Sequence, residues 1–529
     1  MEERRLEARS ARRLALLLAV VLLAACSDST SAPDAHGNAE DTVNTEAGSV
    51  HGVMYEPYRV FHAIPYAAPP TGERRWRRPE PVEPWQGVRE ATEPAPNCPQ
   101  TEPGPQSEDC LFLTVTSPRT ASPQRLRPVL VWLHGGDFNA GGSRGYDAHR
   151  LATEGDIVVV TPNYRLGVLG LLALPGLEDS GSFGMLDQQA ALRWVQRNIR
   201  AFGGDPGNVT LAGESAGSLS TCGHLASPGA AGLFHKAIME SGTCMYTWPK
   251  MGKTHVVFQS LQDATALGTQ EAAALGCADP ANALACLRAK PFEALLPRTP
   301  QFANPAHGNA ALPEHPAAAL RANRFHHVPA LVGSNRDEEA LFTAFNHPQP
   351  LSAAAYRTRL DDDFGPATAA KVIEQYVPGD DDNRLLHAAV FTDRIRARST
   401  WETEQVLATQ VPVFAFEFAD RSAPKLPGFP EVGIPLGACH ASDLPYRLDL
   451  PGFTPPFTPA QQQLASHLIR YWAQFVRTGD PNAPGLPTWP RFEGHMATPY
   501  VQSLAPDTIG PVDYAAEHRL SFWGEAAAQ

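Results

Sequence analysis

Six short runs of apolar and β-branched residues recur along the 529-residue chain, and their order limits the possible folds more than any other feature. Each run is continuously apolar, which is typical of strands covered on both faces. Stretches with helical spacing lie between them, most clearly at residues 187–201 and 461–477. This alternation predicts an α/β protein with a mostly parallel sheet flanked by helices, and a site at the carboxyl ends of the strands. The six runs are residues 129–133, 157–161, 209–212, 237–240, 330–333 and 413–417.

Two long stretches interrupt this alternation. Roughly residues 250–325 and 345–410 are rich in alanine and proline, and long segments of this kind in a compact domain often serve a binding site. We therefore expect helical insertions that roof the site. No glycine- and serine-rich linker divides the chain, which favours a single folded domain over residues 48–529.

Composition and charge exclude two classes of protein. With 43% hydrophobic and 19% charged residues the chain can bury a sizeable core, so it is not wholly disordered. The 56 acidic residues outnumber the 43 basic ones, for a net charge of −13, and the one basic cluster of the expected domain is short. No nucleic-acid partner is expected, because such partners require a broad basic surface. The cluster consists of Arg74, Arg75, Arg77 and Arg78.

The amino terminus predicts export. Residues 1–25 place five arginines ahead of an apolar run that is short for a membrane span, as in a secretory signal peptide. The run ends in Leu23-Ala24-Ala25-Cys26, which resembles the bacterial lipobox, where cleavage leaves a lipidated cysteine as the first residue. We expect lipidation of Cys26, and an ordinary signal cleaved near Ala25 is the alternative.

The residues that follow suit a tether. Residues 26–47 are rich in small and polar side chains and nearly lack large apolar ones, so we expect a flexible link to a domain that starts near Gly48. Ser27 rather than aspartate follows the cysteine, which favours the outer membrane of a Gram-negative bacterium. With an ordinary signal the protein would be periplasmic or secreted. The lipid anchor is the only membrane contact expected.

One short motif points to chemistry. Gly213-Glu214-Ser215-Ala216-Gly217 directly follows the run at 209–212 and precedes a predicted helix. This order is typical of a nucleophile elbow, in which a sharp turn lifts a serine hydroxyl above the sheet. The turn needs small residues at 213 and 217 because the chain passes close to itself there. A five-residue motif recurs by chance in long chains, so its context decides.

The context extends well beyond the motif. From Phe202 the chain reads FGGDPGNVTLAGESAG, and five further stretches occur in matching order. Together they resemble the type-B carboxylesterase family, the relatives of cholinesterases and bacterial para-nitrobenzyl esterases. The resemblance covers roughly residues 48–525 and implies an α/β-hydrolase fold, with helical insertions over the site. The five stretches are IPYA from Ile64, EDCL from Glu108, NYR from Asn163, FGMLDQ from Phe183 and TGDPN from Thr478.

A nucleophilic serine requires two partners. Its hydroxyl is weakly reactive at neutral pH, so it needs a base within hydrogen-bond reach and an acid that orients the base. The resemblance implies Ser215 as nucleophile, His440 in the stretch GACHASDLP as base and Glu338 as acid. Three acids are adjacent here, and the family has glycine where this chain has Glu339. We expect Asp337 to cap a helix that begins near Glu339, with Glu339 in its first turn.

The loop after the run at 129–133 is the candidate oxyanion hole. It reads His134-Gly135-Gly136-Asp137, and the resemblance implies that the N–H groups of Gly136, Asp137 and Ala216 receive the negative charge that acyl transfer builds on the carbonyl oxygen. The family usually has a third glycine at position 137. We therefore expect the Asp137 carboxylate to point away from the oxyanion.

Seven cysteines follow Cys26, and an exported chain can pair them. The resemblance implies the disulfides Cys98–Cys110 and Cys277–Cys286, each closing a short loop. A bond between two of the remaining three, Cys244 and Cys439, is one possibility. The remaining three are Cys222, Cys244 and Cys439.

The expected function is that of a serine carboxylesterase. The alcohol of a small-molecule ester would leave first, and water would then release the acid from an acyl-enzyme. No cofactor is expected, and the paired histidines and acidic runs lack metal-ligand spacing, so no metal is expected either. The alternatives are a non-catalytic binding protein on the same fold, or an amide-cleaving or acyl-transferring relative with the same residues.

Overall fold

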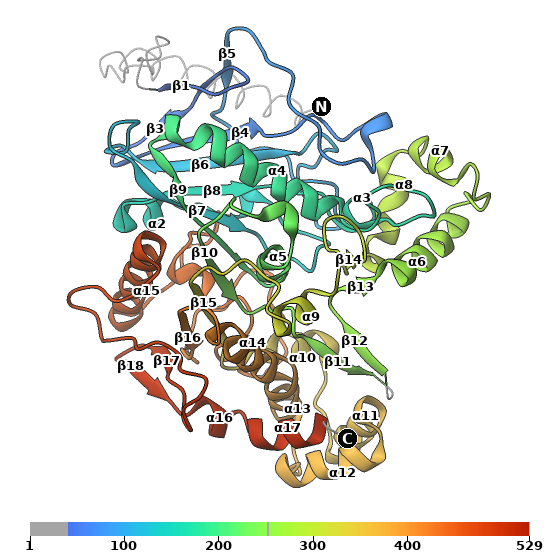
Figure 1. Ribbon diagram of the computed structural model, residues 1–529. Helices are drawn as coiled ribbons and strands as arrows, with labels where there is room; N and C mark the ends of the chain where they lie inside the picture. The colour runs from blue at the N-terminus through green and yellow to red at the C-terminus, as the bar shows by residue number, and fades with distance from the viewer. Residues whose placement is uncertain (1–40, 251–252, 528–529) are drawn as a thin grey trace, which may run out of the picture. The chain divides into compact units, whose positions relative to one another are not determined.

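The computed structural model describes residues 41–250 and 253–527 (Figure 1). Val43–Gln529 form one compact unit. The predicted signal peptide and Cys26 lie outside the described residues. No helix in the described ranges is long and apolar enough to cross a membrane.

A large sheet runs through this unit, and eleven of its strands lie in the described residues (Figure 1). The inner strands, from β17 to β8 in sheet order, pair in parallel, whereas β18 at one edge and β6, β4 and β3 at the other are antiparallel. In sheet order the strands are β18 (Thr508–Val512), β17 (Val501–Ala505), β16 (Val413–Phe418), β15 (Ala330–Asn335), β10 (Lys236–Glu240), β9 (Gly204–Glu214), β7 (Arg127–Leu133), β8 (Val158–Pro162), β6 (Phe112–Pro118), β4 (Tyr58–Pro65) and β3 (Val53–Met54).

The six apolar runs supply six of the seven parallel strands in the described residues, and β17 was not among the predicted runs. The six runs fall in β7, β8, β9, β10, β15 and β16, which confirms the predicted fold class. The register aligns the strand ends, because Leu133 pairs with Gly213, Glu214 with Glu240, and Glu240 with Gly333. The loops that leave these strands therefore meet at one edge of the sheet, where α/β proteins place their sites.

Both faces of the parallel strands are covered. In β7 all residues are buried, and alternate side chains enter different cores: Val129, Val131 and Leu133 one, Leu130 and Trp132 the other. This explains the continuous apolar runs, since a buried Val or Leu stabilises the fold by about 1.5–3 kcal/mol on either face. Helices α4 (Phe183–Asn198) and α5 (Ala216–Leu225) contribute to the first core, and α2 (His149–Gly155) and α15 (Pro459–Thr478) to the second.

Helix α15 shows how local sequence sets an element's ends. Thr458 accepts the Gln461 N–H and the Gln461 side chain accepts the Thr458 N–H, forming a capping box, and Pro459 occupies the first helical position. Gly479 ends the helix at φ 78°, a conformation that glycine adopts without strain.

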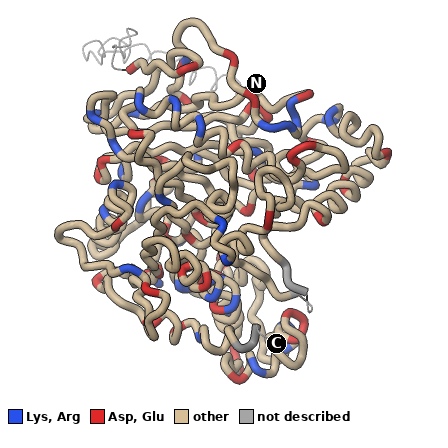
Figure 2. The backbone as a smooth tube through the Cα atoms, in the orientation of Figure 1, with Lys and Arg blue, Asp and Glu red and all other residues tan. Residues whose placement is uncertain are grey.

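Charged residues of both signs are interspersed along the described chain (Figure 2). A few pairs are internal. Asp187, buried in α4, accepts two hydrogen bonds of 2.7 Å from the Arg165 guanidinium, which links α4 to the loop after β8. Removing one partner of such a buried pair costs about 3–5 kcal/mol, so this pair explains why the NYR and FGMLDQ stretches occur together.

The two insertions differ from expectation in one respect. Both are helical, but none of the described residues of the first lines the main cavity. Arg75 instead donates to the carbonyl oxygens of Leu287 and Lys290, which holds this insertion against the amino-terminal segment. The first contains α6 (Leu261–Ala274), α7 (Ala283–Arg288), α8 (Phe292–Leu295) and α9 (Pro316–Arg321); the second contains α11 (Ala353–Phe364), α12 (Pro366–Gln375), α13 (Arg384–Phe391), the π-helix η7 (Thr392–Ala397) and α14 (Arg398–Ala408).

The remaining elements are short. Helix α3 follows β8, α10 follows β15, and α16 and α17 follow the last strand. Strands β11 and β12 pair antiparallel at the start of the first insertion, before its helices, and β13 pairs with β14. Their bounds are α3 (Gly167–Leu171), α10 (Ala340–Asn346), α16 (Tyr514–Glu517), α17 (Leu520–Ala527), β11 (Thr247–Lys250), β12 (Lys253–Val256), β13 (Gln259–Ser260) and β14 (Ala306–His307).

Three disulfides lie in the described residues. Two join the pairs that the resemblance implies, Cys98–Cys110 and Cys277–Cys286. The suggested Cys244–Cys439 bond is wrong, because Cys244 pairs with Cys222 and Cys439 is free and buried. Helix α5 packs on β10, and this brings Cys222 over the loop that carries Cys244. Adjacency in sequence to His440 misled the prediction, since Cys439 instead packs with Ala340, Leu341 and Ala388.

Residues before the expected domain start near Gly48 also form a strand. Strand β1 (Thr42–Asn44) belongs to a small sheet with β2 (Ser49–His51) and β5 (Val88–Glu90). Val43 is buried, and the Glu46 N–H donates to Asn198 Oδ1 at 2.8 Å. A single apolar residue in a polar segment was too weak a signal to predict this strand.

Candidate active site

A sharp turn between β9 and α5 presents Ser215. The residue has φ 54° and ψ −122°, and its N–H donates to the carbonyl oxygen of Glu240 on the neighbouring strand. A Cβ on Gly217 would collide with the Leu133 carbonyl oxygen, and one on Gly213 with the Gly217 backbone. Both glycines are therefore required by close packing, as the sequence predicts. The turn directs the Ser215 side chain into a cavity.

His440 and Glu338 form a close ionisable contact near this turn. His440 Nδ1 lies 2.6 Å from Glu338 Oε2, and the Asn335 N–H donates to Glu338 Oε1 at 2.8 Å. Glu338 is fully buried. Burial raises the pKa of this carboxyl, but His440 and Arg396 lower it more, so the pKa stays below its usual value.

The loop that carries His440 is anchored to two strands. Asn335 Nδ2, at the end of β15, donates to the Cys439 carbonyl oxygen at 2.7 Å and to Asp443 Oδ1 at 2.9 Å. Arg447 bridges Asp443, at 2.6 Å, and Glu240 at the end of β10. These fully buried contacts fix the position of the histidine relative to the strand ends. The roles of Asn335, Asp443 and Arg447 could not be predicted from the sequence, because no local motif links residues about 100 positions apart.

Glu214 is a second carboxylate beside the histidine. Its Oε1 lies 3.2 Å from His440 Nε2. Burial raises the pKa of Glu214, and the nearby His440 opposes that rise by favouring the carboxylate. Burial lowers the pKa of His440, but Glu214 and Glu338 raise it more, so it lies above its usual value. The contact of Glu214 with His440 was not predicted from the sequence. The one signal for it is the place of Glu214, which directly precedes Ser215 at the end of β9.

The neighbours of Glu338 point elsewhere. Asp337 accepts hydrogen bonds from Arg421, at 2.8 and 2.9 Å, and from the Ala438 N–H at 3.0 Å. Glu339 faces the cavity, where Arg396 Nε donates to its Oε1 at 2.6 Å. The expectation that Asp337 caps a helix is wrong, because α10 begins at Ala340 and Glu339 occupies the cap position without a side-chain cap. Both carboxylates instead form ion pairs with arginines that are distant in sequence, Asp337 with Arg421 and Glu339 with Arg396.

The loop after β7 and the start of α5 present free N–H groups. Gly136 and Asp137 have positive φ values of 103° and 55°. In the described part of the chain the N–H groups of Gly136, Asp137 and Ala216 donate to no protein acceptor. The Asp137 carboxylate also lines the cavity, contacts Asn139 Nδ2 at 3.4 Å, and has a pKa raised by burial. The backbone can thus stabilise an oxyanion, but the carboxylate remains close to the cavity.

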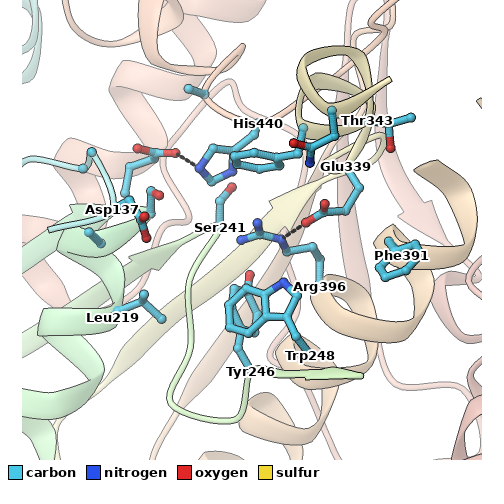
Figure 3. Close-up of a pocket in the computed structure, with 18 of the residues that line it drawn as sticks. Asp137, Leu219, Ser241, Tyr246, Trp248, Glu339, Thr343, Phe391, Arg396 and His440 are labelled. Atoms are coloured by element: carbon cyan, nitrogen blue, oxygen red, sulfur yellow. Dashed lines mark hydrogen bonds and ion pairs between the residues drawn. The ribbon is translucent and has the colours of Figure 1, made fainter. Parts of the chain in front are cut away.

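These groups share one cavity of ≈ 860 Å³ (Figure 3). Its lining includes Ser215, His440, Gly136 and Asp137. Tyr246, Trp248 and Arg396 lie together in its wall (Figure 3). The second insertion contributes Arg359, Asp363, His387, Phe391 and Arg396, so this insertion does cover the site as predicted. A ligand of moderate size would meet both apolar and charged walls.

Comparison with known proteins connects this geometry with a family. A sequence model described as "Carboxylesterase family" matches residues 39–523. The chain is 35% identical to the para-nitrobenzyl esterase of Bacillus subtilis (strain 168), over 85% of this chain and 92% of that protein. It is 32% identical to the pyrethroid hydrolase Ces2e of Rattus norvegicus, over 92% and 90%, and 32% identical to the cocaine esterase of Homo sapiens, over 89% and 88%. A solved structure titled "PNB ESTERASE" superposes with a TM-score of 0.76 and 33% identity, covering 91% of this chain and 100% of that one.

Proposed function

The chain belongs to the carboxylesterase family and is a carboxylic ester hydrolase, and from this premise we propose that it acts through an acyl-enzyme on Ser215. The observation that carries the proposal is the contact of His440 Nδ1 with Glu338, which leaves Nε2, 3.2 Å from Glu214 Oε1, to act as the base in the cavity that Ser215 also lines. A buried acid that holds one nitrogen orients the other as a base.

The reaction follows from these positions. His440 takes the hydroxyl proton of Ser215 while the oxygen attacks the ester carbonyl, and then gives that proton to the leaving alcohol. The N–H groups of Gly136, Asp137 and Ala216 stabilise the oxyanion. Water, activated by the same histidine, then releases the carboxylic acid. The free N–H groups argue against a merely binding role for the site, since a binding protein would not need them.

A common acyl-enzyme can be tested by partitioning. Butanoate esters of different alcohols, hydrolysed with methanol present, should all give the same ratio of methyl butanoate to butanoic acid, because one intermediate is shared. Gas chromatography measures both products. Ratios that change with the leaving alcohol would contradict the proposal.

The activity should depend on pH through His440. The base must be neutral, so kcat/KM should rise as pH increases through the pKa of His440, which the two carboxylates raise above the usual 6.5. Glu214→Gln removes one of these charges, so the acid limb should move to lower pH. The pH profile of kcat/KM measures this, with the exposed Glu293→Gln as a matched control that should leave the limb in place. An unmoved limb in Glu214→Gln would show that Glu214 does not act on His440.

We further propose that the protein is exported and anchored through a lipidated Cys26. The three disulfides support export, because such bonds persist in oxidising compartments. In a Gram-negative host, Cys26→Ser should move the protein from the membrane fraction to the soluble periplasm or leave it unprocessed, whereas Ser27→Ala should not. Immunoblots of fractionated cells and mass spectrometry of the amino terminus measure this. An unmodified amino terminus in the wild type would refute lipidation.

A further inference from the structure

Arg396 is an arginine on the wall of the catalytic cavity. It belongs to η7, a π-helical turn, and such turns often occur at functional sites. The turn is held in place by its other residues. Asp393 Oδ2 accepts the Tyr376 hydroxyl at 2.6 Å, and Thr392 Oγ1 accepts the Glu339 N–H at 3.0 Å. Arg396 is therefore presented to the cavity by a rigid element.

The surroundings of Arg396 restrict how a ligand reaches it. The rings of Tyr246, Phe342 and Trp248 lie 4.9, 5.1 and 5.8 Å from its guanidinium carbon. Figure 3 shows the guanidinium beside Glu339, with Tyr246 and Trp248 next to it. Rings against a guanidinium cover its faces, so its N–H groups are approached along the plane.

Hydrogen-bond donors remain in this part of the cavity. The guanidinium has five N–H groups, and by hydrogen-bond geometry one of them, on Nε, has an acceptor among the described residues, Glu339 Oε1. By the same geometry the Tyr246 hydroxyl, buried and part of the same wall, has no hydrogen-bond partner in the part of the chain that the structure describes, although Arg396 and Thr400 lie near enough to lower its pKa against the larger effect of burial. Unpaired donors in a buried site favour a ligand that brings an acceptor, because leaving them unsatisfied costs free energy.

The local charge decides which acceptor fits. Glu339 already neutralises Arg396, with side-chain exposures of 9% and 8%. Asp137 also lines the cavity. Arg396 lowers the pKa of the Asp137 carboxyl, but burial raises that pKa more. A carboxylate on the substrate would add a second uncompensated negative charge, whereas a neutral oxygen would not.

We propose that Arg396, paired with Glu339, makes the enzyme prefer esters that carry a neutral acceptor oxygen, such as a carbonyl, in the group beside the scissile bond. The inference rests on the proposed function, since it concerns the same cavity. Arg396 and Glu339 are then specificity-determining residues. Their position on the cavity wall distinguishes this role from a purely structural ion pair.

Near-isosteric substrate pairs test the preference. In the acyl series, 4-nitrophenyl 4-oxopentanoate is compared with the 4-methylpentanoate, and 5-oxohexanoate with 5-methylhexanoate; in the alcohol series, 3-oxobutyl butanoate is compared with 3-methylbutyl butanoate. Mono-4-nitrophenyl succinate supplies a carboxylate. The readout is the ratio of kcat/KM for each oxo ester over its methyl partner, so differences in intrinsic reactivity cancel between variants.

The informative variant is Arg396→Met combined with Glu339→Gln, because Arg396→Met alone would leave a buried carboxylate unpaired. In at least one series the oxo preference should fall by about 10-fold or more, the size expected for a lost hydrogen bond to a charged donor. Arg394→Met, on the same turn but not on the cavity wall, is the matched control and should keep the preference. If the double variant does not fold, as judged by its melting temperature, Arg396→Lys should still weaken the preference by removing the planar fork of donors.

Each result has one meaning. An unchanged ratio in the double variant, or no oxo preference in a wild type that hydrolyses the methyl esters, overturns this inference and leaves the acyl-enzyme proposal intact. A stronger preference for the succinate than for the oxo esters overturns the neutral-acceptor assignment. Absence of hydrolysis in every series contradicts the proposed function itself.

Discussion

Ser215→Ala is expected to lower kcat at least about 10³-fold, because without the hydroxyl no acyl-enzyme forms and only the oxyanion donors and substrate binding remain. The measurement is kcat for 4-nitrophenyl butanoate at equal folded fraction. Ser218→Ala is a matched control in the same helix, since the Ser218 hydroxyl donates to the Gly242 carbonyl oxygen at 2.5 Å. That variant should lose stability and keep the order of magnitude of kcat.

Covalent labelling tests independently whether Ser215 is the nucleophile. An organophosphate should modify the wild type at a single residue, Ser215, and inactivate it in proportion to labelling. Peptide mass spectrometry identifies the residue. Esterase activity close to wild type in Ser215→Ala, or stoichiometric labelling elsewhere, would show that the nucleophile is a different group.

Glu338→Gln is expected to lower kcat by as much as about 10⁴-fold, because an amide does not stabilise the imidazolium or hold the correct tautomer. The amide oxygen can still accept the Asn335 N–H, which now goes to Glu338 Oε1 at 2.8 Å, so the loop should keep its conformation. The loss should therefore appear in kcat at equal folded fraction, with a smaller change in melting temperature.

The two adjacent acids are the matched controls. Asp337→Asn weakens the contacts with Arg421 and the Ala438 N–H, and Glu339→Gln weakens that with Arg396. Both should change the melting temperature far more than kcat, because neither carboxylate touches His440. A large loss of kcat in Glu339→Gln with an active Glu338→Gln would reassign the orienting acid.

Much of the fold could be predicted because its signals are local. A parallel strand covered on both faces is apolar at most positions, so β7, β8, β9, β10, β15 and β16 are visible as nearly continuous apolar runs. The elbow is equally local, since Gly213 and Gly217 are required by backbone contacts around a single turn. Strand β1 carries no such local signal, because its three residues include a single buried valine and resemble the polar tether before them in sequence.

The sequence by itself determined the α/β class, the order of the strands along the chain and the turn that presents Ser215, since each depends on residues close together in the chain. Only the tertiary structure decided which partners the ionisable and sulfur groups found. Glu339 met Arg396, 57 residues away, Glu214 met His440, and Cys222 rather than Cys439 met Cys244. Successive side chains near a helix start diverge by about 100°, so neighbours in sequence face different surroundings. Which surroundings they face depends on the packing of distant segments, and local patterns contain no record of that packing.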